Sequence, residues 1–105
     1  MSANYVLEVA IFRVKPEFQS TMPELRQGLR EALKDFPGLL EYTALEPMSQ
    51  HDTNQFADVA KWTDYECASA AAKAFESGDA RFLPYMLAIE SVEFMGHFAP
   101  EVFRS

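Results

Sequence analysis

The sequence predicts a single α+β domain whose elements follow the order β-α-β-β-α-β. Three observations support this prediction. The chain has 105 residues, of which 49% are hydrophobic, so it can build one core and is too short for two. Segments rich in β-branched and aromatic residues alternate with segments whose apolar residues recur every three or four positions. Proline and glycine stand at the junctions between these segments.

Residues 5–14 are predicted to form the first strand, because they are dominated by valine, isoleucine, leucine and aromatic side chains. The strand is expected to stop at Lys15-Pro16. Proline lacks the backbone N–H that a sheet ladder needs, and it restrains the residue before it.

The first helix is predicted over about residues 21–36. Pro23 is tolerated only in the first turn of a helix, and Thr21 with Glu24 matches a T-x-x-E capping box around it. Pro37-Gly38 is expected to end the helix. The apolar face of this helix would comprise Phe18, Met22, Leu25, Leu29, Leu33 and Phe36.

Two further strands are predicted at residues 39–46 and 55–62, joined as a hairpin by the polar run 49–54. A second capping box, Thr63 with Glu66, would then open a helix that ends near Gly78. The face of this helix would present Tyr65, Ala68, Ala72 and Phe75. After it come a short helical turn within residues 79–87 and a last strand over residues 91–98.

This order is that of the split βαβ, or ferredoxin-like, arrangement, with a four-stranded antiparallel sheet and both helices on one face. The first strand is apolar on both sides: Tyr5, Leu7, Val9 and Ile11 point one way, and Val6, Ala10, Phe12 and Val14 the other. Because two helices cover only one side, a second copy of the sheet is expected on the other, giving a homodimeric α+β barrel. The alternative is a monomer whose second face is covered by the tail, residues 101–105.

Charge and composition exclude several classes of partner. The chain carries 9 basic and 16 acidic side chains, a net charge of −7, without a basic block. Such a surface disfavours nucleic acid and anionic membranes. Glu8 and Arg13 interrupt the longest apolar stretch, which is far shorter than the roughly 20 residues of a membrane span. A single cysteine and the lack of a leader-like start lead us to expect a cytoplasmic protein.

Two acidic residues in apolar strands are candidate site residues. Asp58 stands beside Phe56, Val59 and Ala60, where an unpaired charge is costly. Either Arg81 or another cation pairs with it, or its pKa is tuned for use, and an ion pair and a catalytic acid are equally supported. Glu8 is a pocket candidate for the same reason, with a cross-strand cation as the alternative.

The aromatic and basic candidates each have a structural alternative. Trp62 shares a strand face with Asp58 and Phe56 and is either a pocket wall or a core anchor. Tyr42, Tyr65 and Tyr85 are possible phenolic donors. His97 is a candidate base on the last strand, whereas His51 lies in the polar loop; two histidines without carboxylates at ligand spacing do not predict a metal site.

The segment Phe56-Ala57-Asp58-Val59-Ala60-Lys61-Trp62-Thr63-Asp64-Tyr65-Glu66 resembles the strand, tryptophan and capped helix start of the antibiotic biosynthesis monooxygenase family, a branch of the dimeric α+β barrels. The first strand, Pro37-Gly38 and the Arg81-Phe82 turn fall at corresponding places. The resemblance implies cofactor-independent oxidation of hydroxylated aromatic compounds to quinones, with Trp62, Arg81 and the residue at position 58 in the site. The family has asparagine where this chain has Asp58, and a carboxylate would accept a phenol proton where an amide donates a hydrogen bond. Haem chemistry is not implied, since Ala70-Ala71-Ala72 stands where the haem-degrading branch has its tryptophan.

The chain has no G-x-S-x-G, G-x-G-x-x-G, P-loop or paired C-x-x-C motif, so no cofactor is predicted. We therefore predict a cofactor-independent monooxygenase acting on a small planar phenolic or quinol compound in a pocket between sheet and helices. The alternatives are a non-catalytic small-ligand-binding or scaffold protein and a proton-abstracting isomerase or cyclase. The predicted catalytic residues are Asp58, Trp62 and Arg81, and the predicted substrate-binding residues are Glu8, Phe56, Tyr65, Phe75 and His97.

Overall fold

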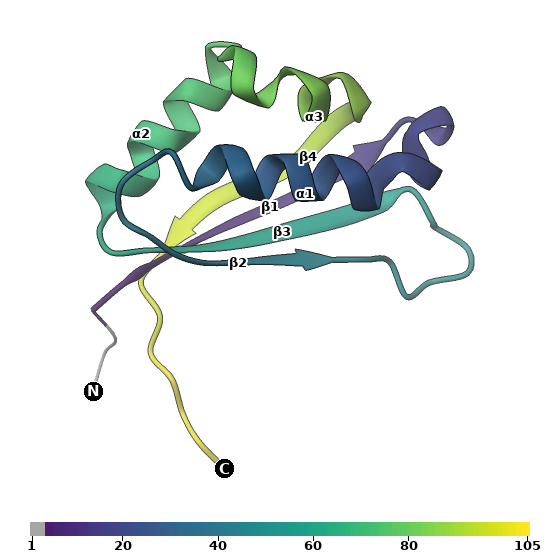
Figure 1. Ribbon diagram of the computed structural model, residues 1–105. Helices are drawn as coiled ribbons and strands as arrows, with labels where there is room; N and C mark the ends of the chain where they lie inside the picture. Colours follow the sequence, from purple (N-terminus) through teal and green to yellow (C-terminus); the bar gives the residue numbers. More distant parts are fainter. Residues whose placement is uncertain (1–3) are drawn as a thin grey trace.

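The computed structural model describes residues 4–105 and contains one four-stranded antiparallel sheet covered on one side by helices (Figure 1). The order in the sheet is β2-β3-β1-β4, so the two central strands are the first and third in the chain. The predicted ferredoxin-like order is confirmed. The strands are β1 (Val6–Val14), β2 (Leu39–Leu45), β3 (Gln55–Trp62) and β4 (Ile89–Phe98). The helices are α1 (Met22–Leu33), α2 (Tyr65–Glu76) and α3 (Leu83–Ala88), with 3-10 turns η1 (Pro16–Thr21) and η2 (Ala80–Phe82).

Both predicted capping boxes were wrong in detail. At α1, the turn η1 leads directly into the helix, so Thr21 already has a helical backbone, and its hydroxyl donates to the Phe18 carbonyl at 2.9 Å. At α2, the cap is one residue later than predicted. Asp64 adopts the extended conformation of an N-cap, and its carboxylate accepts a hydrogen bond from the Cys67 amide at 2.8 Å.

The core lies between the sheet and the helices. In the register of β1 with β3, Val6 pairs with Trp62, Glu8 with Ala60 and Ala10 with Asp58, and these residues all face the helices. The largest fully buried side chains are Trp62, Phe12, Phe82, Met22 and Val14. Glu8 and Asp58 therefore stand on the face of the sheet that packs against this core.

Gly38 joins α1 to β2 in a conformation that only glycine adopts readily. Its φ is +91°, and an added Cβ would lie 2.6 Å from the Cys67 sulfur. Gly38→Ala is expected to lower the free energy of unfolding by about 2–4 kcal/mol, combining backbone strain with overpacking.

Gly78→Ala is the matched control for this prediction. Gly78 also has a positive φ, +80°, but nothing lies within 4 Å of its added Cβ. Gly78→Ala should therefore lower the free energy of unfolding by only about 1–2 kcal/mol, through backbone strain. If urea unfolding shows the same loss of unfolding free energy for both variants, the expected overpacking of Gly38→Ala against Cys67 is contradicted.

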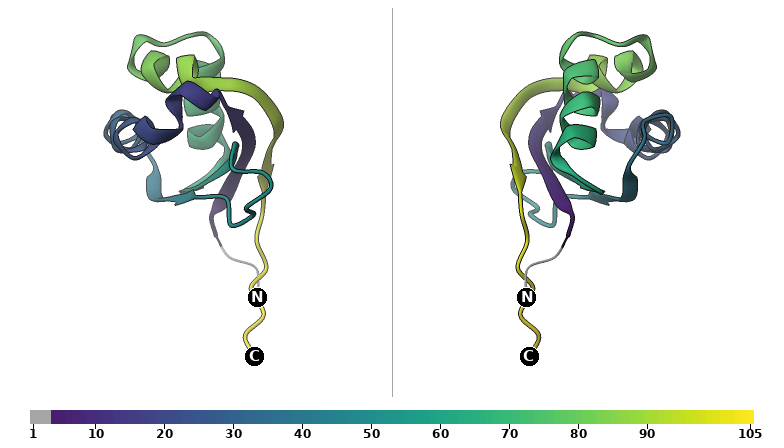
Figure 2. Two further views of the ribbon diagram at one scale, coloured as in Figure 1. Left: turned by 90° about the vertical axis from the view of Figure 1, so that its right-hand side faces the viewer. Right: turned by 90° about the vertical axis from the view of Figure 1, so that its left-hand side faces the viewer.

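The helices lie on one side of the sheet, and its other side is open (Figure 2). That side carries many apolar side chains. Leu7, Val9 and Ile11 are only half-buried there, and Phe98, which pairs with Leu7, is 47% exposed. The tail does not cover this face: it runs away from the end of the sheet, and Phe103 is 84% exposed (Figure 1). The sheet therefore presents the uncovered surface on which the prediction of a second copy was based.

Within residues 4–105, no helix is long and apolar enough to cross a membrane. The cytoplasmic location stays a prediction.

Candidate functional site

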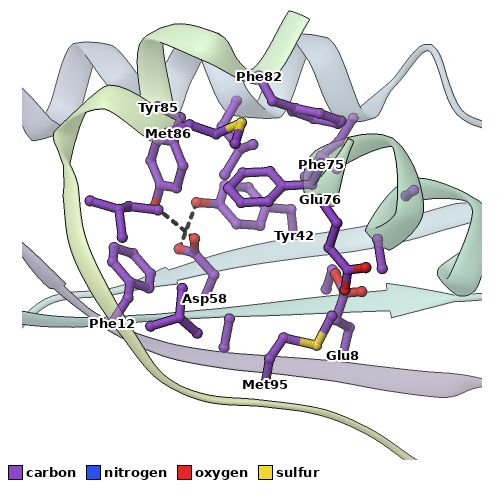
Figure 3. A pocket seen from close by; sticks show the side chains of 18 residues that line it. Glu8, Phe12, Tyr42, Asp58, Phe75, Glu76, Phe82, Tyr85, Met86 and Met95 are labelled. Atoms are coloured by element: carbon purple, nitrogen blue, oxygen red, sulfur yellow. Dashed lines mark hydrogen bonds between the residues drawn. The ribbon is translucent and has the colours of Figure 1, made fainter. Parts of the chain in front are cut away.

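A cavity of about 370 Å³ lies between the sheet and the helices (Figure 3). Its lining comes from β1, β2, β3, β4, α1, α2, α3 and η2 and is mostly apolar, with aromatic walls from Phe12, Phe75 and Phe82. A volume of this size suits a small bicyclic or tricyclic molecule. The polar side chains in the lining are Glu8, Tyr42, Asp58, Glu76 and Tyr85.

Asp58 is the centre of a hydrogen-bonded cluster at the cavity. The Tyr42 hydroxyl donates to one carboxylate oxygen at 2.8 Å, and the Tyr85 hydroxyl donates to the other at 2.6 Å. Arg26 donates from Nη2 to the first oxygen at 3.2 Å. Figure 3 shows the two tyrosines reaching Asp58 from opposite elements, the edge strand β2 and helix α3.

Burial controls the protonation of this cluster. It raises the pKa of Asp58, and the hydrogen bond from Tyr85, the charge of Arg26 and the hydrogen bond from Tyr42 offset part of that rise. Burial and the neighbouring Asp58 carboxylate raise the pKa of both Tyr42 and Tyr85. The tyrosines therefore remain neutral hydrogen-bond donors, and Asp58 is held in place by three donors.

Arg26, and not Arg81, is the cation that pairs with Asp58. It is only 6% exposed, donates also to the Ala57 carbonyl at 2.9 Å, and lies over the Phe56 ring at 4.9 Å. The sequence reading missed it, although a signal was present: Met22, Arg26, Leu29 and Leu33 recur at steps of four, three and four. An arginine inside such an apolar stripe indicates a buried partner of opposite charge.

Glu8 and His97 form a second polar pair beside the cavity. They are directly opposite each other on β1 and β4, and Glu8 Oε2 lies 2.8 Å from His97 Nε2. Burial raises the pKa of Glu8, and the hydrogen bond and charge of His97 offset part of that rise. The edge of the Tyr65 ring contacts the His97 ring, with 5.4 Å between centroids.

The structure brings three of the predicted site residues, Asp58, Glu8 and Phe75, to the cavity lining. Trp62 is fully buried in the core outside that lining, and its indole N–H has no partner within residues 4–105. Phe56 is also in the core, stacked on Phe12.

The remaining predicted residues stand further from the cavity. Arg81 pairs with Asp79 at 2.7 Å and lies over the Phe36 ring at 4.3 Å. Tyr65 is 60% exposed, and His97 reaches the cavity only through Glu8. The two tyrosines on Asp58, Tyr42 and Tyr85, had been named only as possible phenolic donors.

No group of three or more His, Cys, Asp or Glu side chains is arranged to hold a metal ion in the part of the chain that the structure describes. The cavity itself offers carboxylates and phenols to a ligand, together with a predominantly apolar surface. Such an arrangement can bind a planar molecule with a hydroxyl group and can accept a proton from it.

Together, the sheet order, the placement of the helices and the cavity between them define a ferredoxin-like α+β domain with an internal cavity. No protein-family model matches the chain, and no curated protein matches it. Similar folds are found among solved structures. The chain is similar to SnoaB, a cofactor-independent oxygenase from Streptomyces nogalater, with a TM-score of 0.67 and 19% identity over 98% of this chain and 97% of that one.

Two proteins described as antibiotic biosynthesis monooxygenases are similar to the same extent. The one from Chloroflexus aurantiacus has a TM-score of 0.68 and 16% identity, covering 96% of this chain and 97% of that one. The one from Nitrosomonas europaea has a TM-score of 0.70 and 14% identity, covering 95% and 93%. At these identities the likeness establishes the fold, and for the fold it confirms the resemblance seen in the sequence.

Proposed function

We propose that the protein is a cofactor-independent monooxygenase that oxidises a small planar phenolic or quinol compound in the cavity between sheet and helices. The observation that carries this proposal is the apolar, aromatic-walled cavity with Asp58, Tyr42 and Tyr85 at one place in its lining. Its similarity to SnoaB, an oxygenase that needs no cofactor, supports the same reaction class.

The proposed reaction balances without a reductant. A phenol with hydrogen on its para carbon and one molecule of O₂ give a para-quinone and one molecule of water. A hydroquinone, oxygenated at a ring carbon that carries hydrogen, gives a hydroxyquinone and one molecule of water. The phenol must first lose its O–H proton, because the electron-rich phenolate is the species that reacts with oxygen. The protein has to bind the ring in an apolar site, orient its hydroxyl and accept a proton, and the residues of the cavity provide all three.

We propose that the Asp58 cluster orients the substrate. Both tyrosine hydroxyls donate to Asp58, and the Tyr85 oxygen also accepts a hydrogen bond from Arg26 Nε at 3.5 Å, so the Tyr42 oxygen is the one available to accept a hydrogen bond from the substrate's O–H. Trp62 and Arg81 have no part in this proposal, since they lie outside the cavity lining.

The test is oxygen consumption by chelator-treated protein with a panel of naphthols and hydroquinones. The proposal expects uptake above the uncatalysed rate, one quinone formed for each O₂ consumed, and no hydrogen peroxide. Peroxide in place of water would indicate an oxidase, and no uptake with any compound would contradict the proposal.

The second candidate function is binding of a small ligand without catalysis. It is favoured by the hydrogen bonds that Asp58 already makes within the protein. Both carboxylate oxygens already accept hydrogen bonds from the protein. Tight binding of naphthols in calorimetry, together with no oxygen uptake and no proton abstraction, would favour this function. Proton abstraction without oxygen uptake would favour an isomerase or cyclase.

We also propose that the protein is a homodimer joined through the open face of the sheet. Val9 is half-buried and lies on this face in the central strand β1. Its neighbours across the sheet are Val59 on β3 and Gly96 on β4. Exposed apolar surface around it, including Phe94 and Phe98, is what a second sheet would cover.

Val9→Lys is expected to convert a dimer into a monomer, because it places a charge in the centre of the proposed interface. Size-exclusion chromatography with light scattering measures the mass directly. Gln27→Lys, at an exposed position of α1, is the control and should leave the dimer intact. A monomeric wild-type protein at micromolar concentration would contradict the proposed dimer.

A further inference from the structure

We infer that Glu8, held by His97, is the group that accepts the substrate's proton. This inference rests on the proposed function in that it takes the cavity as the place of reaction. It concerns the proton transfer alone, which precedes any reaction with oxygen and can be measured without it.

The geometry leaves one oxygen of Glu8 available to a ligand. Glu8 projects from the middle of β1 into the cavity lining, and His97 contacts only Oε2, at 2.8 Å. Within residues 4–105, Oε1 makes no hydrogen bond. The pair therefore has one oxygen that fixes the carboxylate and a second that is free to take a proton.

Asp58 is a poorer proton acceptor than Glu8. Its two oxygens receive hydrogen bonds from Tyr42, Tyr85 and Arg26, which occupy three of the roughly four lone-pair positions of the carboxylate, whereas His97 is the one donor to Glu8 among the described residues. Hydrogen bonds to the charged form of a carboxylate also favour that form. Asp58 and its tyrosines are thus suited to orienting the substrate, while Glu8 carries the proton.

The charged groups around Glu8 are His97 and two carboxylates. His97 faces it from β4, Asp58 from β3, and Glu76 lines the same cavity from α2. Among the described residues, no lysine or arginine lines the cavity. Burial raises the pKa of Glu8, the contact with His97 lowers it, and the charge of Asp58 raises it. With its pKa raised, Glu8 binds a proton more strongly than a surface carboxylate does. The pKa of Asp58 is raised as well, so the free Oε1 of Glu8 is what distinguishes the two carboxylates.

The proposed step moves one proton. The substrate's O–H or activated C–H bond breaks, a Glu8 O–H bond forms, and the electron pair stays on the substrate as a phenolate or enolate. Oxygen adds to the para carbon of the phenolate, and the C–H and O–O bonds there then break, so that the C–H hydrogen leaves on the distal oxygen as hydroxide. The hydroxide takes the proton back from Glu8 and leaves as water. Glu8 is then a carboxylate again, and no further reactant is required.

The test measures deuterium exchange at the α carbon of a tetralone, a bicyclic ketone, in deuterated buffer under argon. Proton NMR follows the loss of the α hydrogens, so the result does not depend on oxygen. We expect wild-type protein to accelerate exchange and Glu8→Gln to lose about 100-fold of that acceleration, the usual scale of general base catalysis. Glu66→Gln, at an exposed position of α2, is the control and should match wild type.

Folding and pH dependence separate a catalytic from a structural role. Because burial disfavours the charge on Glu8, Glu8→Gln should unfold at the same or a higher temperature than wild type at neutral pH. The exchange rate should fall as pH drops through the pKa of Glu8. His97→Asn should move that fall to higher pH, because His97 lowers the pKa of Glu8.

Three results would overturn the inference: no exchange by wild type above the buffer rate, exchange by Glu8→Gln within twofold of wild type, or an acid limb that His97→Asn does not move. Its failure is distinct from failure of the proposed function. If exchange depends on Glu8 but no oxygen is consumed, the monooxygenase function is contradicted and the role of Glu8 as proton acceptor is supported. If Glu8→Gln still consumes oxygen, the role of Glu8 is contradicted and the monooxygenase function is supported.

Discussion

Replacing Trp62 with alanine is expected to lower the free energy of unfolding by about 3–5 kcal/mol. The side chain is fully buried at the end of β3, opposite Val6 on β1 and Leu39 on β2. Its removal leaves a cavity that three strands of a rigid sheet cannot close. Urea unfolding followed by circular dichroism measures the loss.

Trp62→Phe is the matched variant, because it keeps an aromatic ring and adds no polar group. Its loss should be less than half that of Trp62→Ala. The indole N–H, which has no partner among the described residues, contributes little that phenylalanine would forfeit. A Trp62→Ala protein with nearly wild-type stability and no activity would contradict the structural role of Trp62 and would instead indicate a catalytic one.

Arg26→Met is expected to cost about 3–5 kcal/mol, because it leaves the buried Asp58 carboxylate without its cation. The side chains of Arg26 and Asp58 are 7% and 13% exposed, so water cannot replace the lost contact. Without Arg26, the pKa of Asp58 rises further, and a charged Asp58 then opposes folding. The loss should therefore be largest at neutral pH and shrink as the pH falls and Asp58 becomes protonated.

Two variants test the origin of this effect. Arg81→Met removes a cation that pairs with Asp79 near the surface, and it should leave the unfolding free energy nearly unchanged. Adding Asp58→Asn to Arg26→Met should recover part of the lost stability, since no unpaired charge remains. A double variant less stable than Arg26→Met at neutral pH would contradict the ion-pair explanation.

The fold could be predicted from the sequence because each element carries a local signal. Alternating and continuous apolar runs marked the strands, and Pro37-Gly38 marked the junction after α1. The helix starts were less certain. A serine, threonine or aspartate at neighbouring positions can cap equally well, and the choice between Thr63 and Asp64 depends on the backbone conformation of the turn.

The candidate site was predictable only in part, because a shared strand face does not determine which residues reach the same cavity. Asp58 and Trp62 are four residues apart on β3, which separates them by about 13 Å along the strand. Asp58 lines the cavity, and Trp62 is buried outside its lining.

The cation for Asp58 was a second point that the sequence left open. Arg81 and Arg26 were both available by composition, and the distance along the chain does not discriminate between them. Packing of α1 on the sheet brings Arg26 to Asp58, whereas η2 places Arg81 over Phe36. The stripe that contains Arg26 was the signal within the sequence for the correct partner.

The central claim is that the cavity between sheet and helices is the place of reaction. Ala72 lines that cavity, and Ala70 is exposed on the same helix, so the same substitution at these two positions separates filling the cavity from altering α2. We would measure oxygen uptake with a naphthol for wild type, Ala72→Phe and Ala70→Phe. The account predicts uptake by wild type and Ala70→Phe and loss of uptake in a folded Ala72→Phe protein. Equal uptake by all three proteins would contradict it.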